Sequence, residues 1–131
     1  MRTRLSLTID DVQPMMTAAL QAARDAGRAV SIAIVDDAGV LLDFRRMDGA
    51  RPHTVEVSQR KARVSAMVGV PTSVIEAMAK DRPVAPDMMV VQGGMPAIHH
   101  GDCVGGIGVS GGKPEEDDAI CTAGLGALKG G

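Results

Sequence analysis

Two side chains near the middle of the chain are the first candidates for chemistry, His53 and Lys61. His53 stands just before Thr54 in an expected loop, where its imidazole either faces a pocket or lies on the surface. An imidazole titrates near pH ~6.5, so it both takes and gives protons at neutral pH. Lys61 falls near the apolar face that Val57 and Val64 mark on a predicted helix. A lysine there buries its stem and needs a partner for its head, either the end of a helix or strand or the carboxylate of a ligand.

Other residues are placed by the predicted elements so that they could complete a site around this pair. Arg46 ends a predicted strand and Arg82 lies in a loop, and both are cations that could hold a carboxylate. Gly93 and Gly94 form a turn, where missing side chains leave room for the floor of a pocket. We predict His53 and Lys61 as catalytic residues. The predicted ligand-binding residues are Arg46, Thr54, Glu56, Arg82, Gly93 and Gly94.

Three motifs suggest metal or phosphate binding at first sight, but their context argues otherwise. His99 and His100 are neighbours in sequence, so on a strand they point to opposite faces. Cys103 and Cys121 lack the spacing of metal ligands, and we expect both to be reduced. The glycines of residues 105–112 lie within and just after a predicted strand, and the acidic helix start that follows repels phosphate. We therefore predict neither a metal nor a nucleotide site.

Composition excludes several classes of partner. The net charge is −2, without a basic stripe, which argues against nucleic-acid binding. No apolar run approaches the ~18 residues that span a membrane, and the first residues lack the apolar region of a secretory signal. We therefore expect a soluble cytoplasmic protein. The chain has nine methionines but Phe44 is its one aromatic residue, so the core must be aliphatic.

Hydrophobic periodicity and turn residues predict one α+β domain over residues 1–131. Pro14 fits the first helix only if the cap lies near Asp10 or Asp11, and Thr54 is the expected N-cap of the second helix. We expect residues 129–131 to fray. The first predicted helix starts between Thr8 and Asp11 and stops at Gly27. The other predicted helices are 54–68, 73–80 and 114–128, and the predicted strands are 29–35, 40–47, 88–91, 97–99 and 103–110. Short turns between strands favour one five-stranded antiparallel sheet with helices packed on it.

Several segments occur in the order found in one known family. They are Leu7-Thr8, residues 30–36 with Gly39, residues 46–50, 60–62, 71–72, 93–96 and 101–111, the acidic run to Asp118, and residues 123–125. The chain resembles the GlcG/HbpS family of heme-binding-like proteins, which also forms the C-terminal domain of some corrinoid adenosyltransferases. The resemblance covers nearly the whole chain.

This resemblance implies a profilin-like fold with a five-stranded antiparallel sheet, and self-association into dimers or larger homo-oligomers. It also implies heme or a related planar ligand, held at a pocket near subunit contacts in some members. Members with a histidine heme ligand in the first helix have no counterpart here, because no histidine precedes His53. His53 and His99 are the remaining candidate ligands.

Two functions therefore stay open. The first is a binding protein for heme, a corrinoid fragment or another small planar ligand. The second is a small isomerase, tautomerase or lyase acting on a carboxylated catabolic intermediate without a cofactor. In that enzyme Arg46, Lys61 or Arg82 would bind the carboxylate, and His53 would shuttle the proton.

Overall fold

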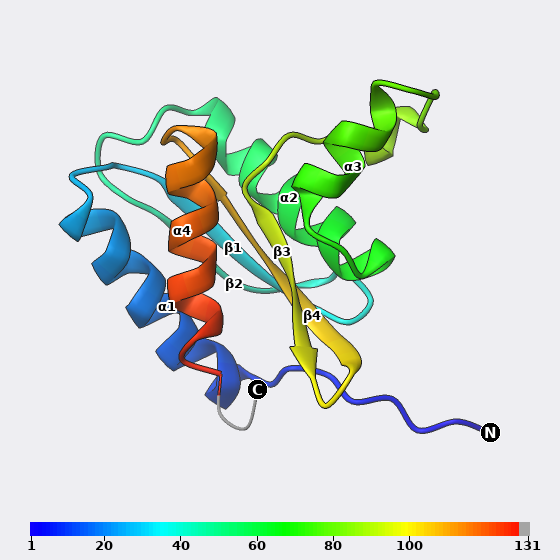
Figure 1. Cartoon of the computed structure of the whole chain (residues 1–131). Coiled ribbons are helices and arrows are strands. Elements are labelled where there is room, and N and C mark those ends of the chain that lie inside the picture. Colours follow the sequence, from blue (N-terminus) through cyan, green and yellow to red (C-terminus); the bar gives the residue numbers. More distant parts are fainter. Residues whose placement is uncertain (129–131) are drawn as a thin grey trace.

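The computed structural model, which describes residues 1–128, is a four-stranded antiparallel sheet between two layers of helices (Figure 1). The strand order is β2-β1-β4-β3, so β1 and β4 are central and β2 and β3 are edges. The strands are β1 (Ser31–Asp36), β2 (Leu41–Arg46), β3 (Gly94–His99) and β4 (Asp102–Ser110). The helices are α1 (Ile9–Asp25), α2 (His53–Val68), α3 (Thr72–Ala79) and α4 (Pro114–Leu125), with a 3-10 turn η1 (Pro86–Met88).

The α+β class is confirmed, but the number of strands is four rather than the predicted five within residues 1–128. The predicted strand at 88–91 is absent. Pro86 instead starts the 3-10 turn, in which the Met88 N–H bonds the Ala85 carbonyl at 2.8 Å. A run of four apolar residues is too short for periodicity to distinguish a strand from an irregular segment. Strand β3 begins earlier than predicted, at Gly94, and pairs Pro96 with Gly106 of β4.

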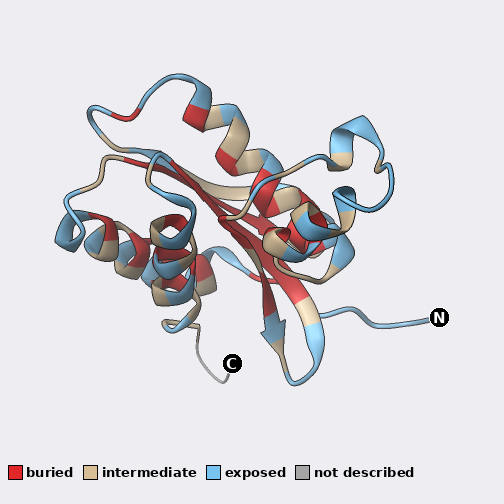
Figure 2. Ribbon diagram, turned by 45° about the horizontal axis from the view of Figure 1, so that its top comes forward, coloured by how far each residue is buried: buried red, intermediate tan, exposed pale blue. Residues whose placement is uncertain are grey.

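Helices α1 and α4 lie side by side over one face of the sheet, and α2 covers the other (Figures 1 and 2). The face toward α1 and α4 carries the larger core, in which Ile32, Ile34 and Ile107 pack with Met15 and Ile120. The face toward α2 is built from small residues: Ala33 and Val35 on β1, and Ala62 and Ala66 on α2. Small side chains let α2 lie close to the sheet.

Glycines on β4 complete this close approach. A Cβ at Gly106 would lie 2.6 Å from the Ala62 carbonyl oxygen, and a Cβ at Gly108 would collide with the Ser58 carbonyl. These glycines therefore serve close packing, as expected for glycine inside a strand. The glycines therefore fix the distance between α2 and β4, and with it the position of Lys61 over the sheet.

Two predicted helix starts differ from the structure. Helix α1 is capped at Thr8, whose N–H donates to the Asp11 carboxylate at 2.8 Å, so Pro14 lies inside the helix and not in its first turn. Helix α2 begins at His53, so Thr54 is its second residue and not its cap. The predicted fraying at 129–131 lies outside the described residues. Within residues 1–128, every helix is too short or too polar to cross a membrane.

Candidate functional site

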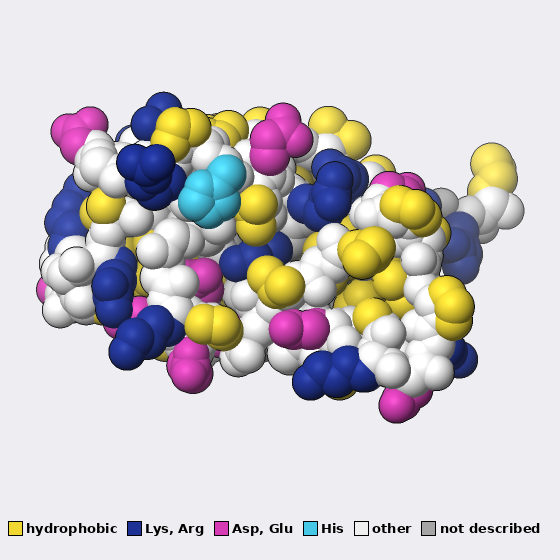
Figure 3. All heavy atoms as spheres, turned by 90° about the horizontal axis from the view of Figure 1, so that it is seen from above, with side chains coloured by type: hydrophobic (Ala, Val, Ile, Leu, Met, Phe, Trp, Pro, Cys, Tyr) yellow, Lys and Arg dark blue, Asp and Glu magenta, His cyan; other side chains and the backbone are white. Residues whose placement is uncertain are grey.

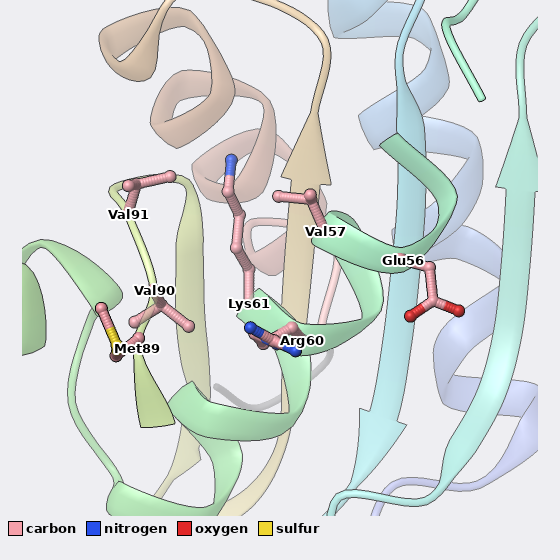
Figure 4. Close-up of a pocket in the computed structure, with 7 residues that line it drawn as sticks. All are labelled: Glu56, Val57, Arg60, Lys61, Met89, Val90 and Val91. Atoms are coloured by element: carbon pink, nitrogen blue, oxygen red, sulfur yellow. The ribbon is translucent and has the colours of Figure 1, made fainter. Parts of the chain in front are cut away.

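A groove runs along α2, with the segment 89–92 as its opposite wall (Figure 4). Its first part is a cavity of about 400 Å³ with mostly apolar walls. Met89 and Val91 are 58% and 50% exposed, so this wall presents apolar surface to solvent. The lining residues are Glu56, Val57, Arg60, Lys61, Met89, Val90 and Val91.

A second cavity of about 490 Å³ continues the groove toward the start of α2 and the turn between β4 and α4. It shares Val57, Lys61 and Val91 with the first cavity and adds polar groups, among them Arg51, His53 and Asp117. The face in Figure 3 shows a histidine, basic side chains and hydrophobic side chains gathered around this hollow. The two cavities together have an apolar half and a polar half, with Lys61 common to both.

Lys61 is the most constrained charged residue of the groove. Its side chain is 3% exposed and runs between Val57 and Val91 (Figure 4). The ammonium Nζ donates to the Val109 carbonyl at 2.7 Å and to Asp117 Oδ2 at 3.3 Å. Of the two partners considered for this lysine, the end of a strand is therefore the one seen, and a carboxylate from α4 joins it.

Asp117 is the buried counter-ion of Lys61. Its Oδ1 accepts the Gly112 N–H at 2.9 Å, so the carboxylate also ties down the turn before α4. Burial raises the pKa of the Asp117 carboxyl, while the charge of Lys61 and the Gly112 hydrogen bond oppose that rise. Asp117 therefore joins Lys61 to the turn before α4 at the polar end of the groove.

His53 and Thr54 lie at the polar end of the groove. His53 is the first residue of α2 and is exposed, and it lines the second cavity together with Lys61. The buried Thr54 hydroxyl donates to the Arg51 carbonyl at 2.6 Å and pairs with Ser31 Oγ at 2.8 Å. Because this hydroxyl is used within the protein, Thr54 positions the start of α2.

The structure separates the other predicted cations from this groove. Arg46 lines a different cavity, beside Leu20 and Arg24, and its Nε donates to the Ala50 carbonyl at 3.1 Å. Arg82 is exposed in the turn after α3 and lines neither cavity of the groove. Glu56 lines the apolar cavity, but its carboxylate points away from Met89 and Val91 (Figure 4).

Gly93 and Gly94 lie under Lys61, as expected for a floor, but the space above them is filled. A Cβ at Gly93 would lie 2.7 Å from Lys61 Nζ, and a Cβ at Gly94 would lie 2.6 Å from the Lys61 carbonyl oxygen. The missing side chains therefore admit Lys61 and α2. Room for a ligand is on the other side of Lys61, in the two cavities.

Sequence reasoning missed the wall 89–92 and Asp117. The apolar pattern of residues 88–91 predicts a strand, whereas 89–92 are irregular in the structure, and the Gln92 backbone N–H donates to the Glu76 carboxylate at 2.9 Å. Asp117 belongs to an acidic run, and because acidic residues are favoured at any helix start, the pattern alone does not single it out. The available signal was the buried lysine itself, since a buried ammonium needs a carboxylate partner.

Metal ligands do not gather in the groove. Within residues 1–128, no three His, Cys, Asp or Glu side chains lie close enough to hold a metal ion. His99 and His100 contact each other edge to face, with ring centroids 4.2 Å apart, at the tip of the β3–β4 hairpin. His99 lines a separate cavity with Leu5 and Val104.

Comparison with known proteins decides the family. The model of the family described as "Haem degrading protein HbpS-like" matches residues 7–126. The chain belongs to this family. GlcG of Escherichia coli K12 is 32% identical over 114 residues, covering 84% of this chain and 85% of GlcG.

Solved structures of the HbpS-like family and of a heme complex share the fold. A double mutant of HbpS from Streptomyces reticuli has a TM-score of 0.91 at 32% identity, covering 98% of this chain and 90% of that protein. A PduOC:heme complex has a TM-score of 0.86 at 24% identity, covering 95% of this chain and 96% of that one. At this lower identity the second likeness concerns the fold alone.

Proposed function

We propose that the protein binds heme or a related planar, anionic small molecule in the groove between α2 and residues 89–92. The observation that carries the proposal is the division of the groove into two halves. Val57 and Met89 to Val91 offer an apolar surface for a flat ring system, and Arg60 and Lys61 lie beside it. Binding sites for drug-sized ligands commonly combine ~300–1,000 Å³ of mostly apolar space with a few placed polar groups.

The family supports the same ligand class. The description of the family names haem, and the fold is shared with a protein solved as a heme complex. In heme proteins the iron is held by histidine, cysteine, methionine or tyrosine. The chain has no tyrosine. Burial raises the pKa of the Cys121 thiol, which disfavours the thiolate that would bind iron.

Within the groove, the residues that fit heme iron are therefore His53, from the polar half, and Met89, from the apolar half. Arg51 and Arg60 are the guanidinium groups that fit the two propionates of heme, because planar guanidinium groups bind carboxylates well. When bound, heme would supply iron and its redox chemistry. The chain would contribute the apolar wall, the axial ligand and the anion-binding edge.

Hemin titration tests the proposal. We expect a shifted Soret band on mixing hemin with the full chain, and loss or displacement of that band in His53→Ala. His99→Ala is the matched control, because His99 lies in a different cavity and its removal should leave the spectrum unchanged. A chain that leaves the hemin spectrum unaltered would contradict heme binding. Loss of the shifted Soret band in His99→Ala but not in His53→Ala would place the heme site outside the groove.

We also propose self-association, as the family resemblance implies. Exposed large apolar side chains support it: Val40, Leu41, Met67 and Val68. The β1–β2 turn and the end of α2 are neighbours, since a Cβ at Gly39 would lie 3.4 Å from Met67 Cγ. Met67 and the β1–β2 turn therefore lie side by side, and the apolar side chains exposed there would form one apolar area.

A further inference from the structure

Lys61 combines three properties of a reactive amine. It is buried, it lines both cavities of the groove, and a carboxylate lies within reach of its Nζ. An ammonium carries three N–H donors, and the Val109 carbonyl and Asp117 account for two of them. An ion pair that only joins two elements can be closed off on all sides. Lys61 instead lines an open groove.

The surroundings of Lys61 shield its aliphatic stem from water and leave its head at the boundary of the two cavities. Val57 and Val91 flank the stem and remove water from it (Figure 4). Desolvated lysines beside an acid–base partner are the ones that act as nucleophiles toward carbonyl groups. Asp117 is such a partner, since its carboxylate lies 3.3 Å from Nζ and can take a proton from it.

We propose that the groove accepts an aldehyde or ketone that carries a carboxylate, and that Lys61 captures it as an imine. The proposal goes beyond ligand binding and shares only the groove with the proposed function. The apolar half would hold the body of the ligand, and Arg60 or Arg51 would hold its carboxylate. The carbonyl carbon would then face Nζ at the boundary between the halves.

The reaction balances without an oxidant or a reductant. Lys61 gives one ammonium proton to Asp117, and the free Nζ lone pair forms a bond to the carbonyl carbon while a proton moves from that nitrogen to the carbonyl oxygen. The resulting carbinolamine loses its hydroxyl group as water, with the proton returned by Asp117. The products are a protonated imine on Nζ and one water molecule, so the positive charge of the lysine is kept.

The test is trapping by reduction. The full chain is incubated with 4-carboxybenzaldehyde and cyanoborohydride, which reduces an imine to a stable secondary amine, and labelled lysines are located by peptide mass spectrometry over time. Lys80 and Lys113 are exposed and act as internal controls in the same sample. We expect Lys61 to be labelled about tenfold faster than either, a barrier lower by about 1.4 kcal/mol.

Two further arms separate this inference from the proposed function. Lys61→Arg keeps the positive charge but forms no imine, so the fast label should disappear while Lys80 and Lys113 react as before. Excess hemin should slow labelling of Lys61 alone if both ligands use the groove. Labelling of Lys61 no faster than that of the exposed lysines would overturn the inference, even where hemin binds. Fast labelling without hemin binding would support it and contradict heme as the ligand.

Discussion

Lys61 illustrates how a single buried charge can serve both the fold and the site. Its ammonium joins α2 to the end of β4 and to α4, through Val109 and Asp117. Removing one member of a buried ion pair is costly because the other charge stays buried without a partner. The stability of the groove therefore depends on the pair remaining complete.

We predict that Lys61→Met lowers the free energy of unfolding by about 3–5 kcal/mol, because Asp117 is left unpaired. Urea unfolding followed by circular dichroism measures it. Burial already raises the pKa of Asp117, and loss of the lysine should raise this pKa further. The stability lost in Lys61→Met should therefore shrink as pH falls and Asp117 becomes protonated. Lys80→Met, at an exposed position, should change stability by less than about 0.5 kcal/mol. Equal effects of the two substitutions would contradict the burial of the pair.

The glycine under Lys61 gives a second prediction at this scale. Gly93 has a φ of +123°, and a Cβ there would lie 2.7 Å from Lys61 Nζ and 2.9 Å from Asp117 Cβ. Gly101 also has a positive φ, +86°, but a Cβ there would contact nothing within 4 Å. Gly101→Ala should therefore cost about 1–2 kcal/mol for backbone strain alone. Gly93→Ala should cost about 1–3 kcal/mol more, from crowding and because a φ of +123° is less accessible to alanine than +86°, and thermal unfolding of the two variants should show this difference.

The candidate residues could be read from sequence only in part. A lysine on an apolar helix face indicated a buried ammonium, and the structure confirms that it bonds a strand end. Its carboxylate could not be identified, because Asp117 is 56 positions away and stands in an acidic run in which no residue type or spacing distinguishes it from its neighbours. Arg46 and Arg82 were grouped with His53 by chemistry alone, and the fold places them elsewhere.

At the level of elements, α4 shows how a helix start is held by charge. The Glu116 carboxylate accepts the Lys113 backbone N–H at 2.8 Å and forms an ion pair with Arg28 at 2.9 Å. The hydrogen bond from Arg28 and that from Lys113 lower the pKa of Glu116. These contacts fix the beginning of α4, and with it the position of Asp117.

A lowered carboxyl pKa has a defined sign in a pH titration of stability. The folded state prefers the ionised Glu116, so its contribution is present above the unfolded pKa of about 4.3. That contribution is lost as pH falls through the lower folded pKa. Glu116→Gln should therefore be less stable than the natural chain at neutral pH, with the difference vanishing in strong acid. Urea unfolding at several pH values measures it, and a difference that persists at the lowest pH would contradict the assignment.

Most elements were predictable because their patterns are long. Helix α1 follows a clear apolar period, the central strands β1 and β4 are runs of apolar and small residues, and the start of β4 agrees with its prediction within one residue. The errors fall where the apolar run is short or where prolines are frequent. Residues 88–91 are apolar enough for a strand, but the 3-10 turn at Pro86 leaves them as a groove wall.

For the whole molecule, the half-exposed apolar area at the β1–β2 turn and the end of α2 leads to an expectation about assembly. Val40 and Met67 are 60% and 55% exposed. If this area is buried between copies, Met67→Glu should shift the chain toward monomer in sedimentation velocity. Leu5→Glu, at an exposed apolar residue of the N-terminal segment, should not. A natural chain that sediments as a monomer at high concentration would contradict self-association.

The position of Pro96 on β3 restricts how copies could join. β3 is an edge strand, and proline offers no N–H to a strand added outside it. The outer rim of β3 is therefore a poor template for continuing the sheet into a second molecule, which is a common beginning of amyloid-like aggregation. Association should consequently proceed through side-chain surfaces and leave this rim as an end of the sheet.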